Sequence, residues 1–354
     1  MYNTLTINGE KYSAKALLEK SRRAILDPEQ PEWYRDIFEF ILDWLEKDDL
    51  EVTTSGTTGE PSVMTFPKSA FVASAKRTIS FFNLNPADRV LLCLPAKYIA
   101  GKMMIARALV GGLDLWITQP KTNPWKDWNK PVKFVPVVPL QLKSLLQYPE
   151  KEVLFETILV GGATIDHSLE RKLQRFGPIV FQSFGMTETL THIAVRRVNG
   201  DKPLDNYRVL EGFNLSTDKE NRLIVSGDNL SKPLYTNDVV TIKDEKHFVW
   251  HGRYDDVINS GGVKVFPEDV EKQISGMIYR RFFIAGLPDK EFGQRVVLIM
   301  EGKPMEESCT EALLNRIRMK VEKHHAPKEI LFFEKFSETE SGKIKRKEIL
   351  KELK

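Results

Sequence analysis

The sequence reads Thr53-Thr54-Ser55-Gly56-Thr57-Thr58-Gly59-Glu60-Pro61 directly after a short apolar run at 50–53. Its two glycines let the backbone turn with N–H groups facing inward, and the hydroxyl side chains add donors. The stretch therefore predicts a phosphate cradle between a strand and a helix-like segment. It is not a Walker loop, because Glu60-Pro61 follows Gly59 in place of Lys and Ser or Thr. Taken alone, a polar surface turn is the alternative.

Around this stretch, short apolar runs alternate with amphipathic segments. The apolar runs lie at 50–53, 90–94, 113–118, 132–138, 157–160 and 179–183, and the amphipathic segments include 69–82 and 167–176. This alternation is typical of βα units around a mainly parallel sheet, whose binding sites gather at the carboxyl ends of the strands. We therefore predict an α/β fold.

The pattern changes twice beyond residue 198. Strands without intervening helices are expected at 207–210, 222–226, 238–242 and 247–250, as in a β-meander or distorted barrel. From about 255, a helix at 267–274, strands at 282–287 and 296–300 and a helix at 311–324 fit a small α+β domain. We predict two domains, 1–254 with a helix-flanked sheet and a β-rich subdomain, and 255–354.

Length and composition exclude several classes of protein. The chain has 354 residues, of which 42% are hydrophobic and 29% charged, so disorder is not expected. Its 52 basic and 49 acidic residues leave a net charge of +3, too weak for a dedicated nucleic-acid or membrane-surface binder. The most apolar stretch, 90–117, is interrupted by charges, and the N-terminus does not read as a signal peptide. We expect a cytoplasmic protein with small-molecule partners.

The cysteines point to no disulfide framework or zinc site. Cys93 and Cys309 lie far apart and form no CxxC pair. Cys93 sits in an apolar run and is expected to be a small buried hydrophobe, whereas Cys309 is expected to be incidental.

A second informative stretch is Gln182-Ser183-Phe184-Gly185-Met186-Thr187-Glu188-Thr189, again at the end of an apolar run. A carboxylate there can hold Mg²⁺ on a polyphosphate, a threonine hydroxyl can meet a phosphate oxygen, and an aromatic ring can lie against a base. A helix N-terminus capped by threonine, with glutamate in its first turn, is an equally good interpretation.

Three further stretches follow in the C-terminal part. Tyr235-Thr236-Asn237-Asp238 with Arg253-Tyr254-Asp255-Asp256 offers a carboxylate for ribose hydroxyls and a forked donor beside it. The run 259–267 contains paired glycines, and 340–347 places a rotatable lysine next to a glycine. A surface ion pair, a hairpin turn and a solvated basic helix face are the respective alternatives.

In this order, the five stretches resemble the adenylate-forming superfamily of acyl-CoA ligases, luciferases and peptide-synthetase adenylation domains. The shared patterns are S-G-T-T-G-x-P, G-x-T-E, Y-x-T-x-D, a G-R-x-D stretch leading to glycine, and a late G-K. The resemblance covers about 53–354. It implies a large nucleotide-binding domain joined to a mobile C-terminal domain, with ATP and Mg²⁺ as cofactors and CoA as cosubstrate.

Within that superfamily, the stretches 185–196 and 98–104 look like short o-succinylbenzoate:CoA ligases of menaquinone biosynthesis. This implies ATP-dependent adenylation of o-succinylbenzoate followed by thioester formation with CoA. Ligation of another aryl or short acyl acid, acyl transfer to a carrier protein, and a non-enzymatic nucleotide sensor remain open as alternatives.

The resemblance also implies a role for each matching residue. The phosphates would be held by Thr54, Ser55, Gly56, Thr57, Thr58 and Gly59. The adenine slot would be lined by Gly161, Gly162, Ala163, Ser183, Phe184 and Gly185. Asp238 and Arg253 would hold the ribose, Glu188 the Mg²⁺, and Thr187 the α-phosphate. Lys343 would serve adenylation, Asp255 the hinge, and Gly261, Gly262 and Lys264 the thioester step.

The carboxylate of o-succinylbenzoate that is not activated needs a cation or several donors at the far end of the pocket. Lys102, Thr191 and His192 are the candidates, and Arg196 is less favoured. The alternatives are a core histidine at 192 and a solvated helix residue at 102.

Three features depart from the superfamily. Ser62 stands where a lysine is usual, so Lys68 is expected to supply that phosphate contact or the contact is missing; Asn237 replaces a glycine, which is mild because Asn tolerates left-handed angles. Relatives also carry over a hundred more residues before the phosphate loop. A sheet edge or apolar patch left by that shorter front would be covered in a homodimer.

Overall fold

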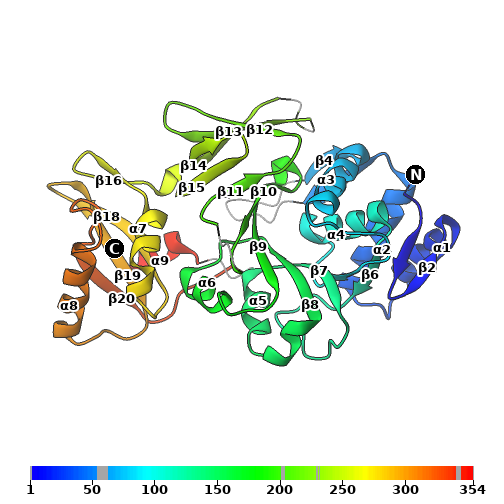
Figure 1. Cartoon of the computed structure of the whole chain (residues 1–354), viewed down its shortest axis with the longest axis horizontal. Helices are drawn as coiled ribbons and strands as arrows, with labels where there is room; N and C mark the ends of the chain where they lie inside the picture. The colour runs from blue at the N-terminus through cyan, green and yellow to red at the C-terminus, as the bar shows by residue number, and fades with distance from the viewer. Residues whose placement is uncertain are drawn as a thin grey trace. The chain divides into compact units, whose positions relative to one another are not determined.

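The computed structural model describes residues 2–53, 63–200, 204–228, 230, 232–339 and 344–353 (Figure 1). Two compact units are present. The first comprises Met1–Thr164, Leu173–Phe213 and Gly227–Lys232, and the second Ile165–Lys172, Asn214–Ser226 and Pro233–Lys354. The predicted boundary at residue 254 concerns which part moves, and it stays a prediction.

The first unit is built on a mixed sheet with the strand order β11-β10-β9-β8-β7-β5-β6-β1-β2. The strands β1 and β5 to β9 pair in parallel with one another. At the two ends of this parallel part, β2 pairs antiparallel with β1, and β10 pairs antiparallel with β9 and β11. Parallel strands covered on both faces read as continuous apolar runs, which is why they were predictable. The strands are β1 Leu5–Ile7, β2 Glu10–Tyr12, β5 Arg89–Leu92, β6 Asp114–Ile117, β7 Val132–Val137, β8 Phe155–Val160, β9 Ile179–Gly185, β10 His192–Arg197 and β11 Tyr207–Val209.

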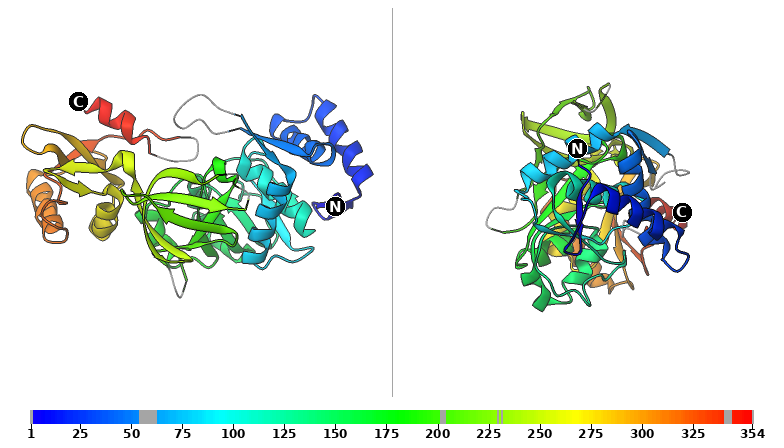
Figure 2. Two further views of the ribbon diagram at one scale, coloured as in Figure 1. Left: turned by 90° about the horizontal axis from the view of Figure 1, so that it is seen from above. Right: turned by 90° about the vertical axis from the view of Figure 1, so that its right-hand side faces the viewer.

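The helices of this unit begin and end for identifiable reasons. In α1, the Ala16 N–H donates to Ser13 Oγ at 3.3 Å, which caps the first turn. The helix α4 is terminated by Gly112, which follows its last residue with a φ of +61°. Figure 2 shows α1 and α2 lying side by side. The helices are α1 Ala14–Leu26, α2 Glu32–Glu46, α3 Lys68–Phe81, α4 Ile99–Gly111 and α5 Pro139–Leu145, while α6 His167–Leu173 spans a unit boundary.

Hydrophobic spacing explains how α2 and α4 pack. Ile37, Phe38, Ile41 and Trp44 lie on one face of α2 and are buried, as expected of an amphipathic helix. The helix α4 is buried from Met103 to Leu109 and is therefore apolar nearly all round. This central position makes any charged residue in α4 unusual.

The strand predicted at 50–53 is present, but it lies in a different sheet from the one expected. The run 50–53 is not part of the parallel sheet: β3 (Asp49–Thr53) pairs antiparallel with β4 (Val63–Pro67) in a separate two-stranded sheet. The stretch 54–62 therefore leads from one strand into another and not directly into a helix. In β3, Leu50 and Val52 are buried and alternate with exposed residues, because only one face is covered.

The second unit contains an antiparallel meander of β12 (Phe213–Thr217), β13 (Arg222–Gly227), β14 (Leu234–Asp244) and β15 (His247–Arg253). The strands expected at 222–226, 238–242 and 247–250 are confirmed. The first strand, β12, was not predicted, since its apolar alternation is short.

The rest of the second unit is an α+β sheet with helices on both faces. The strand order is β17-β16-β19-β18, and β20 pairs parallel with β19. On one face of the sheet, α7 and α8 pack over a buried apolar cluster that includes Ile284 and Leu298. On the other face, α9 packs beside Phe283. The elements are β16 Ile258–Ser260, β17 Val263–Val265, α7 Pro267–Ile274, β18 Phe282–Asp289, β19 Gly293–Glu301, α8 Glu307–Arg318, β20 Glu329–Phe333 and α9 Arg346–Glu352.

The last predicted helix has different bounds in the structure. Residues 311–324 were expected, but α8 ends at Arg318. Leu313, Ile317 and Val321 share helical spacing, yet Val321 enters the same apolar cluster from the turn after the helix. The pattern thus continued past the end of the element.

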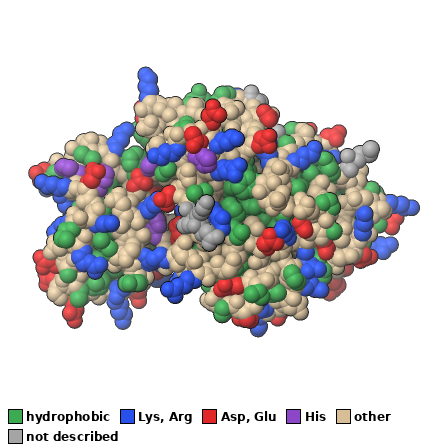
Figure 3. All heavy atoms as spheres, in the orientation of Figure 1, with side chains coloured by type: hydrophobic (Ala, Val, Ile, Leu, Met, Phe, Trp, Pro, Cys, Tyr) green, Lys and Arg blue, Asp and Glu red, His purple; other side chains and the backbone are tan. Residues whose placement is uncertain are grey.

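The surface and the cysteines agree with the composition. On the face seen in Figure 3, basic and acidic side chains are interspersed. Cys93 is buried as predicted, which raises the pKa of its thiol, and Cys309 is exposed. Among the helices of the described ranges, we find none with the length and apolar character that a bilayer crossing requires.

Candidate functional site

The turn after β9 depends on a glycine. A Cβ built on Gly185 would lie 2.4 Å from the Cα of His192 and 2.5 Å from the carbonyl oxygen of Thr191. Both are backbone atoms that a side chain cannot push aside, so only glycine lets β9 and β10 approach here. This close approach fixes where the following residues emerge.

Those residues form a short 3₁₀ turn, Thr187–Thr189, and not the start of an α-helix. The Thr189 hydroxyl donates to the Thr191 carbonyl at 2.7 Å and accepts from the Met186 N–H at 3.2 Å. Thr189 is buried, whereas Glu188 is exposed at the tip. The turn therefore presents the Glu188 carboxylate outward, where a hydrated Mg²⁺ can reach it.

The predicted adenine residues lie together at the carboxyl ends of β8 and β9. The Gly161 N–H donates to the Val137 carbonyl at 2.9 Å, and the Ser183 hydroxyl donates to the Val160 carbonyl at 2.9 Å. A Cβ on Gly161 would lie 3.0 Å from Ser183 Oγ. The small residues thus leave a floor between the two strands, which Gly162 and Ala163 continue.

An aromatic wall stands next to this floor. The ring of Phe184 lies 5.5 Å from that of Tyr207 on β11, measured between centroids, at an interplanar angle of 60°. The contact holds the Phe184 ring in place from one side. A floor of small residues beside an aromatic ring suits a flat base.

The predicted ribose residues face each other across β14 and β15. Asp238 is paired in register with Arg253, whose Nη1 lies 3.9 Å from Asp238 Oδ2. The Trp250 indole N–H donates to Asp238 Oδ1 at 2.9 Å. Only 7% of the surface of Asp238 is exposed to solvent. A buried carboxylate held from one side is a good acceptor for a diol.

The predicted hinge residue joins the same group. The Asn237 amide donates to Asp255 Oδ2 at 3.2 Å, and Arg253 Nη2 lies 3.7 Å from that oxygen. Asn237, which replaces the usual glycine, therefore has a structural role as a partner of Asp255.

The paired glycines form a hairpin turn, which was the alternative to a ligand-binding role. Gly261 and Gly262 have φ of +60° and +84° and connect the paired residues Ser260 and Val263. The Lys264 ammonium lies 5.5 Å from the centre of the Tyr254 ring. Their part in the thioester step stays a prediction.

His192 is buried beside other polar groups of the first unit. Its Nδ1 lies 3.0 Å from Thr191 Oγ1, and its Nε2 lies 3.5 Å from Thr78 Oγ1 on α3. Burial lowers the pKa of His192 well below its usual 6.5, and the charges of Arg107 and Arg77 lower it further. The histidine is therefore neutral at physiological pH, as expected of a core histidine.

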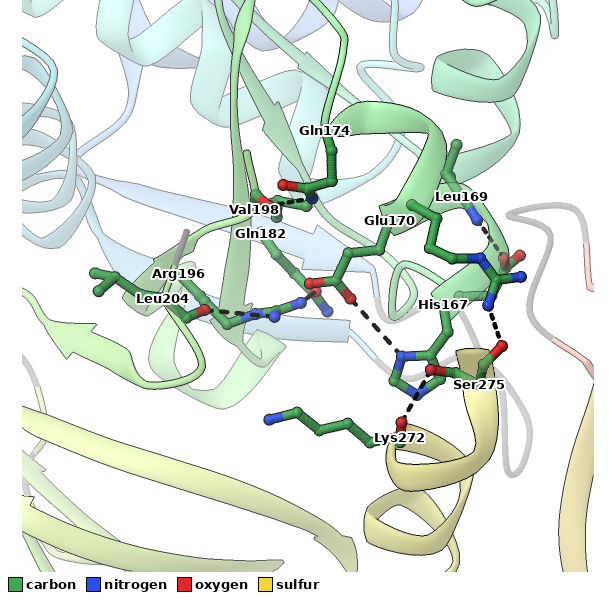
Figure 4. A network of polar contacts seen from close by, with 12 residues as sticks. His167, Leu169, Glu170, Gln174, Gln182, Arg196, Val198, Leu204, Lys272 and Ser275 are labelled. Atoms are coloured by element: carbon green, nitrogen blue, oxygen red, sulfur yellow. Dashed lines mark hydrogen bonds and ion pairs between the residues drawn. The ribbon is translucent and has the colours of Figure 1, made fainter. Parts of the chain in front are cut away.

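The other two acid-recognition candidates have structural partners. The Lys102 ammonium donates to the Glu51 carbonyl at 2.7 Å, and burial lowers the pKa of Lys102. Arg196 Nη2 donates to Gln182 Oε1 at 2.8 Å, and Nη1 contacts the Leu204 carbonyl (Figure 4). These contacts place Lys102 beside the strand that leads into 54–62.

Two arginines that the sequence analysis did not select lie near His192. Arg107 on α4 is 2% exposed, and burial lowers the pKa of its guanidinium to about 10. Arg77 on α3 lies with its guanidinium 4.7 Å from the centre of the Phe213 ring. Neither the Nε of Arg107 nor the Nε and Nη2 of Arg77 has a hydrogen-bond partner among the described residues.

Such nitrogens are costly to bury without a hydrogen-bond partner, although the charge of Asp228 favours the charged form of Arg77. An anion bound beside them would restore the missing interactions. The sequence did carry a signal: Arg107 interrupts the longest apolar stretch of the chain.

Several predicted residues lie outside the described ranges, namely Thr54, Ser55, Gly56, Thr57, Thr58, Gly59, Ser62 and Lys343. Their flanks are described. Thr53 pairs with Val63, and Glu338 forms a bridge with Ile344. Lys68, the residue expected to replace a phosphate contact, begins α3 with its ammonium 4.0 Å from Asp48.

Residues 26–212 match the family of AMP-binding enzymes, which covers more than half of the chain. The chain belongs to this family. It is 32% identical to a solved acyl-CoA synthetase (AMP-forming)/AMP-acid ligase II-like protein from Dyadobacter fermentans, with a TM-score of 0.62 over 93% of this chain and 96% of that one.

The curated proteins similar to this chain include 2-succinylbenzoate–CoA ligases. That of Haemophilus influenzae is 26% identical over 77% of this chain and 64% of its own length, and that of Salmonella typhimurium 25% over 70% and 57%. This AMP-binding chain thus spans about three fifths of their length. A Bacillus subtilis o-succinylbenzoate–CoA synthetase solved with ATP and magnesium shares the fold, with 21% identity and a TM-score of 0.69 over 85% of this chain and 69% of that one.

Proposed function

We propose that this chain is an ATP-dependent, AMP-forming acid:CoA ligase that adenylates o-succinylbenzoate and then transfers the acyl group to CoA. The observation that carries the proposal is the pair of arginines beside His192 in an AMP-binding enzyme, buried Arg107 and half-buried Arg77, with guanidinium nitrogens that lack a hydrogen-bond partner among the described residues. The names of the curated relatives support the choice of acid.

The described nucleotide residues fit ATP. Gly161 and Ser183 leave room for a base next to Phe184, and Asp238 offers a held carboxylate to the ribose. Glu188, exposed on its turn, would share Mg²⁺ with the phosphate oxygens. When bound, Mg²⁺ neutralises part of the charge that develops on the phosphates.

The acid is a dicarboxylate, and its two ends need different surroundings. The activated carboxylate must reach the α-phosphate near Thr187, whereas the other must stay ionised away from water. The guanidinium groups of Arg107 and Arg77 match that second carboxylate in charge and in forked geometry. Thr191 and His192 would add a hydroxyl and a neutral imidazole. Lys102 was expected at the same carboxylate, but its contact with the Glu51 carbonyl leads us to propose it for the phosphate side instead.

Two half-reactions would use the C-terminal part in turn. In adenylation, Lys343 would stabilise the charge that builds on phosphate oxygens as pyrophosphate leaves, an interaction stronger in the transition state than in the ground state. Rotation about Asp255 would then bring Gly261, Gly262 and Lys264 to the acyl-adenylate for attack by the CoA thiol. The moving part would be domain 255–354.

The product's mass tests the proposal. After incubation of the full chain with ATP, Mg²⁺, CoA and o-succinylbenzoate, we expect the mass of the CoA thioester and of AMP. A thioester with another acid in a panel of aryl and short acyl carboxylates, or an acyl group on an added carrier protein, would replace the substrate assignment. No ATP turnover with any acid would overturn the enzyme assignment.

Lys343→Ala separates the half-reactions. We expect it to lose acid-dependent pyrophosphate exchange, by about 3 kcal/mol or more of transition-state stabilisation, yet to form thioester from supplied acyl-adenylate. Equal loss of both would contradict the two-posture scheme.

The assembly and location of the enzyme are further parts of the proposal. We propose a cytoplasmic homodimer, in which a second copy would cover a sheet edge such as that of β2. Light scattering at micromolar concentration measures the mass, and a monomer would exclude the dimer.

A further inference from the structure

The segment that contains Lys343 is joined at its base. The bridge between Glu338 and Ile344 and a hydrogen bond of 2.9 Å from the Lys345 N–H to the Ser337 carbonyl bring its two flanks together. The flanks at 337–338 and 344–345 therefore lie next to each other.

One flank is held by Arg281, which precedes β18. Arg281 Nη2 pairs with the Glu338 carboxylate, and its Nη1 lies 3.6 Å from Glu301 Oε1. The same Glu301 oxygen accepts the backbone N–H of Phe336 at 2.8 Å. The Phe336 ring is buried against Phe283, at 5.3 Å between centroids. Arg281 thus holds the Glu338 carboxylate, and Glu301 holds the backbone of Phe336, whose ring is buried.

The other flank is held by Arg346, the first residue of α9. Its Nη2 donates to Glu271 Oε2 at 2.9 Å, and its Nη1 lies 3.3 Å from Glu268 Oε1. Glu268 and Glu271 are three residues apart on α7 and therefore face the same way. The Arg346 guanidinium also lies over the Phe283 ring at 5.4 Å.

The carboxylates of this second group are themselves fixed. Glu271 is 6% exposed and accepts the Ile284 N–H at 2.8 Å through its other oxygen. A buried and a half-buried acid around one arginine are more than a surface ion pair needs, and removing them from water is costly. A rigid fork between two carboxylates does, however, define the position of α9 closely.

From this geometry, and resting on the proposed function, we propose that Arg281 and Arg346 are positioning residues that hold the two flanks of the Lys343 segment for adenylation. Neither contacts the substrate. Each acts through the backbone of the flank that it holds.

The experiment compares both half-reactions in the full chain. Arg346→Ala and Arg281→Ala are expected to lower kcat of acid-dependent pyrophosphate exchange by ~10- to 100-fold, because misplacing a reacting group by about 1 Å can cost ~100-fold. Thioester formation from supplied acyl-adenylate, which does not use Lys343, is expected to stay within about twofold. Arg346→Lys keeps one charge without the fork and should lie between Arg346→Ala and the unchanged protein.

Arg295→Ala is the matched control, because it breaks an ion pair of 2.8 Å with Glu329 in the same sheet but away from the flanks. It should leave exchange unchanged. Since Arg346→Ala removes the cation between Glu268 and Glu271 and risks misfolding, Glu338→Gln offers a milder test of the other flank with the same expected split.

Equal losses in both half-reactions, or exchange rates that match Arg295→Ala, would overturn the positioning role while the proposed function stands. If none of the tested acids supports pyrophosphate exchange by the unchanged protein, the proposed function fails, and the positioning role fails with it.

Discussion

The indole N–H of Trp250 donates to Asp238 Oδ1 at 2.9 Å, so that one side of the carboxylate is fixed and the other is turned toward Arg253. Asp238→Ala should raise KM for ATP by about 10- to 100-fold, because hydrogen bonds to charged groups contribute about 1.5–3 kcal/mol each. Initial rates of pyrophosphate exchange against ATP concentration measure it. Trp250→Phe, which removes only the indole donor, should have a smaller effect, and an unchanged KM in Asp238→Ala would exclude ribose binding there.

Replacing Arg107 should separate stability from acid recognition. An apolar side chain of similar volume in place of a buried charge is often neutral or stabilising, so Arg107→Met should unfold at the same temperature as the unchanged protein or higher. KM for o-succinylbenzoate should rise at least about 10-fold, from loss of a charged contact of about 1.5–3 kcal/mol.

The matched substrate for Arg107→Met is a monocarboxylic aryl acid, whose weaker activity should not change. Lys102→Ala, by comparison, should leave KM for the dicarboxylate unchanged if its ammonium only supports the Glu51 carbonyl. A rise in KM for Lys102→Ala alone would move acid recognition from Arg107 to Lys102.

His192 should make stability depend on pH in a defined direction. Its pKa in the folded protein lies well below the usual 6.5, mainly because of burial. The unfolded chain therefore binds more protons, and the stability that neutral His192 confers is present above pH 6.5 and lost as pH falls below it. The free energy of unfolding of the unchanged protein should fall relative to His192→Gln between pH 6.5 and lower values.

Glu268 should act in the opposite pH window. Burial raises its pKa to about 7, against the lowering effect of Arg346. The folded state then holds a proton that the unfolded state releases near 4.5, so this contribution to stability is present below 4.5 and lost as pH rises through about 7. Glu268→Gln should gain stability relative to the unchanged protein across that range in denaturant titrations. Parallel curves would contradict the raised pKa.

The turn after β9 should not accept a methyl group. Gly185→Ala places a Cβ within 2.5 Å of two backbone atoms of the next strand, so overpacking should cost about 1–3 kcal/mol of stability and displace Glu188 and Thr187. Exchange activity and the unfolding midpoint should both fall. Gly276, whose Cβ would meet nothing within 4 Å, provides the control, and Gly276→Ala should be close to neutral.

What the sequence revealed depended on how local each signal was. The strands of the parallel sheet were predictable because two-sided burial produces continuous apolar runs, and α7 was predicted with its bounds because Pro267 and two acids mark its first turn. The pairing of β3 was missed, since apolar character alone does not tell a hairpin from a sheet strand.

The candidate site divides in the same way. Asp238 and Arg253 were paired from the chemistry of their two stretches, and the β14–β15 register confirms that they face each other, whereas their part in ribose binding stays a prediction. Arg107 was missed because a charge in an apolar run reads as an interruption until the packing around it is known. Its neighbours come from α3 and β10, which no local pattern connects.

The helix α4 carries both Lys102 and Arg107, for which we propose contacts at opposite ends of the site. Lys102 fastens one of its turns to the carbonyl of Glu51, next to the stretch 54–62, and Arg107 sits five residues further along, which is roughly 7.5 Å of helical rise. Because a packed helix does not stretch, under the proposed function this spacing would fix the distance between the phosphates and the remote carboxylate of the acid. We expect the length of an acceptable acid to be set by this spacing, and enzymes altered to take longer acids to need a change in the helix and not only in its side chains.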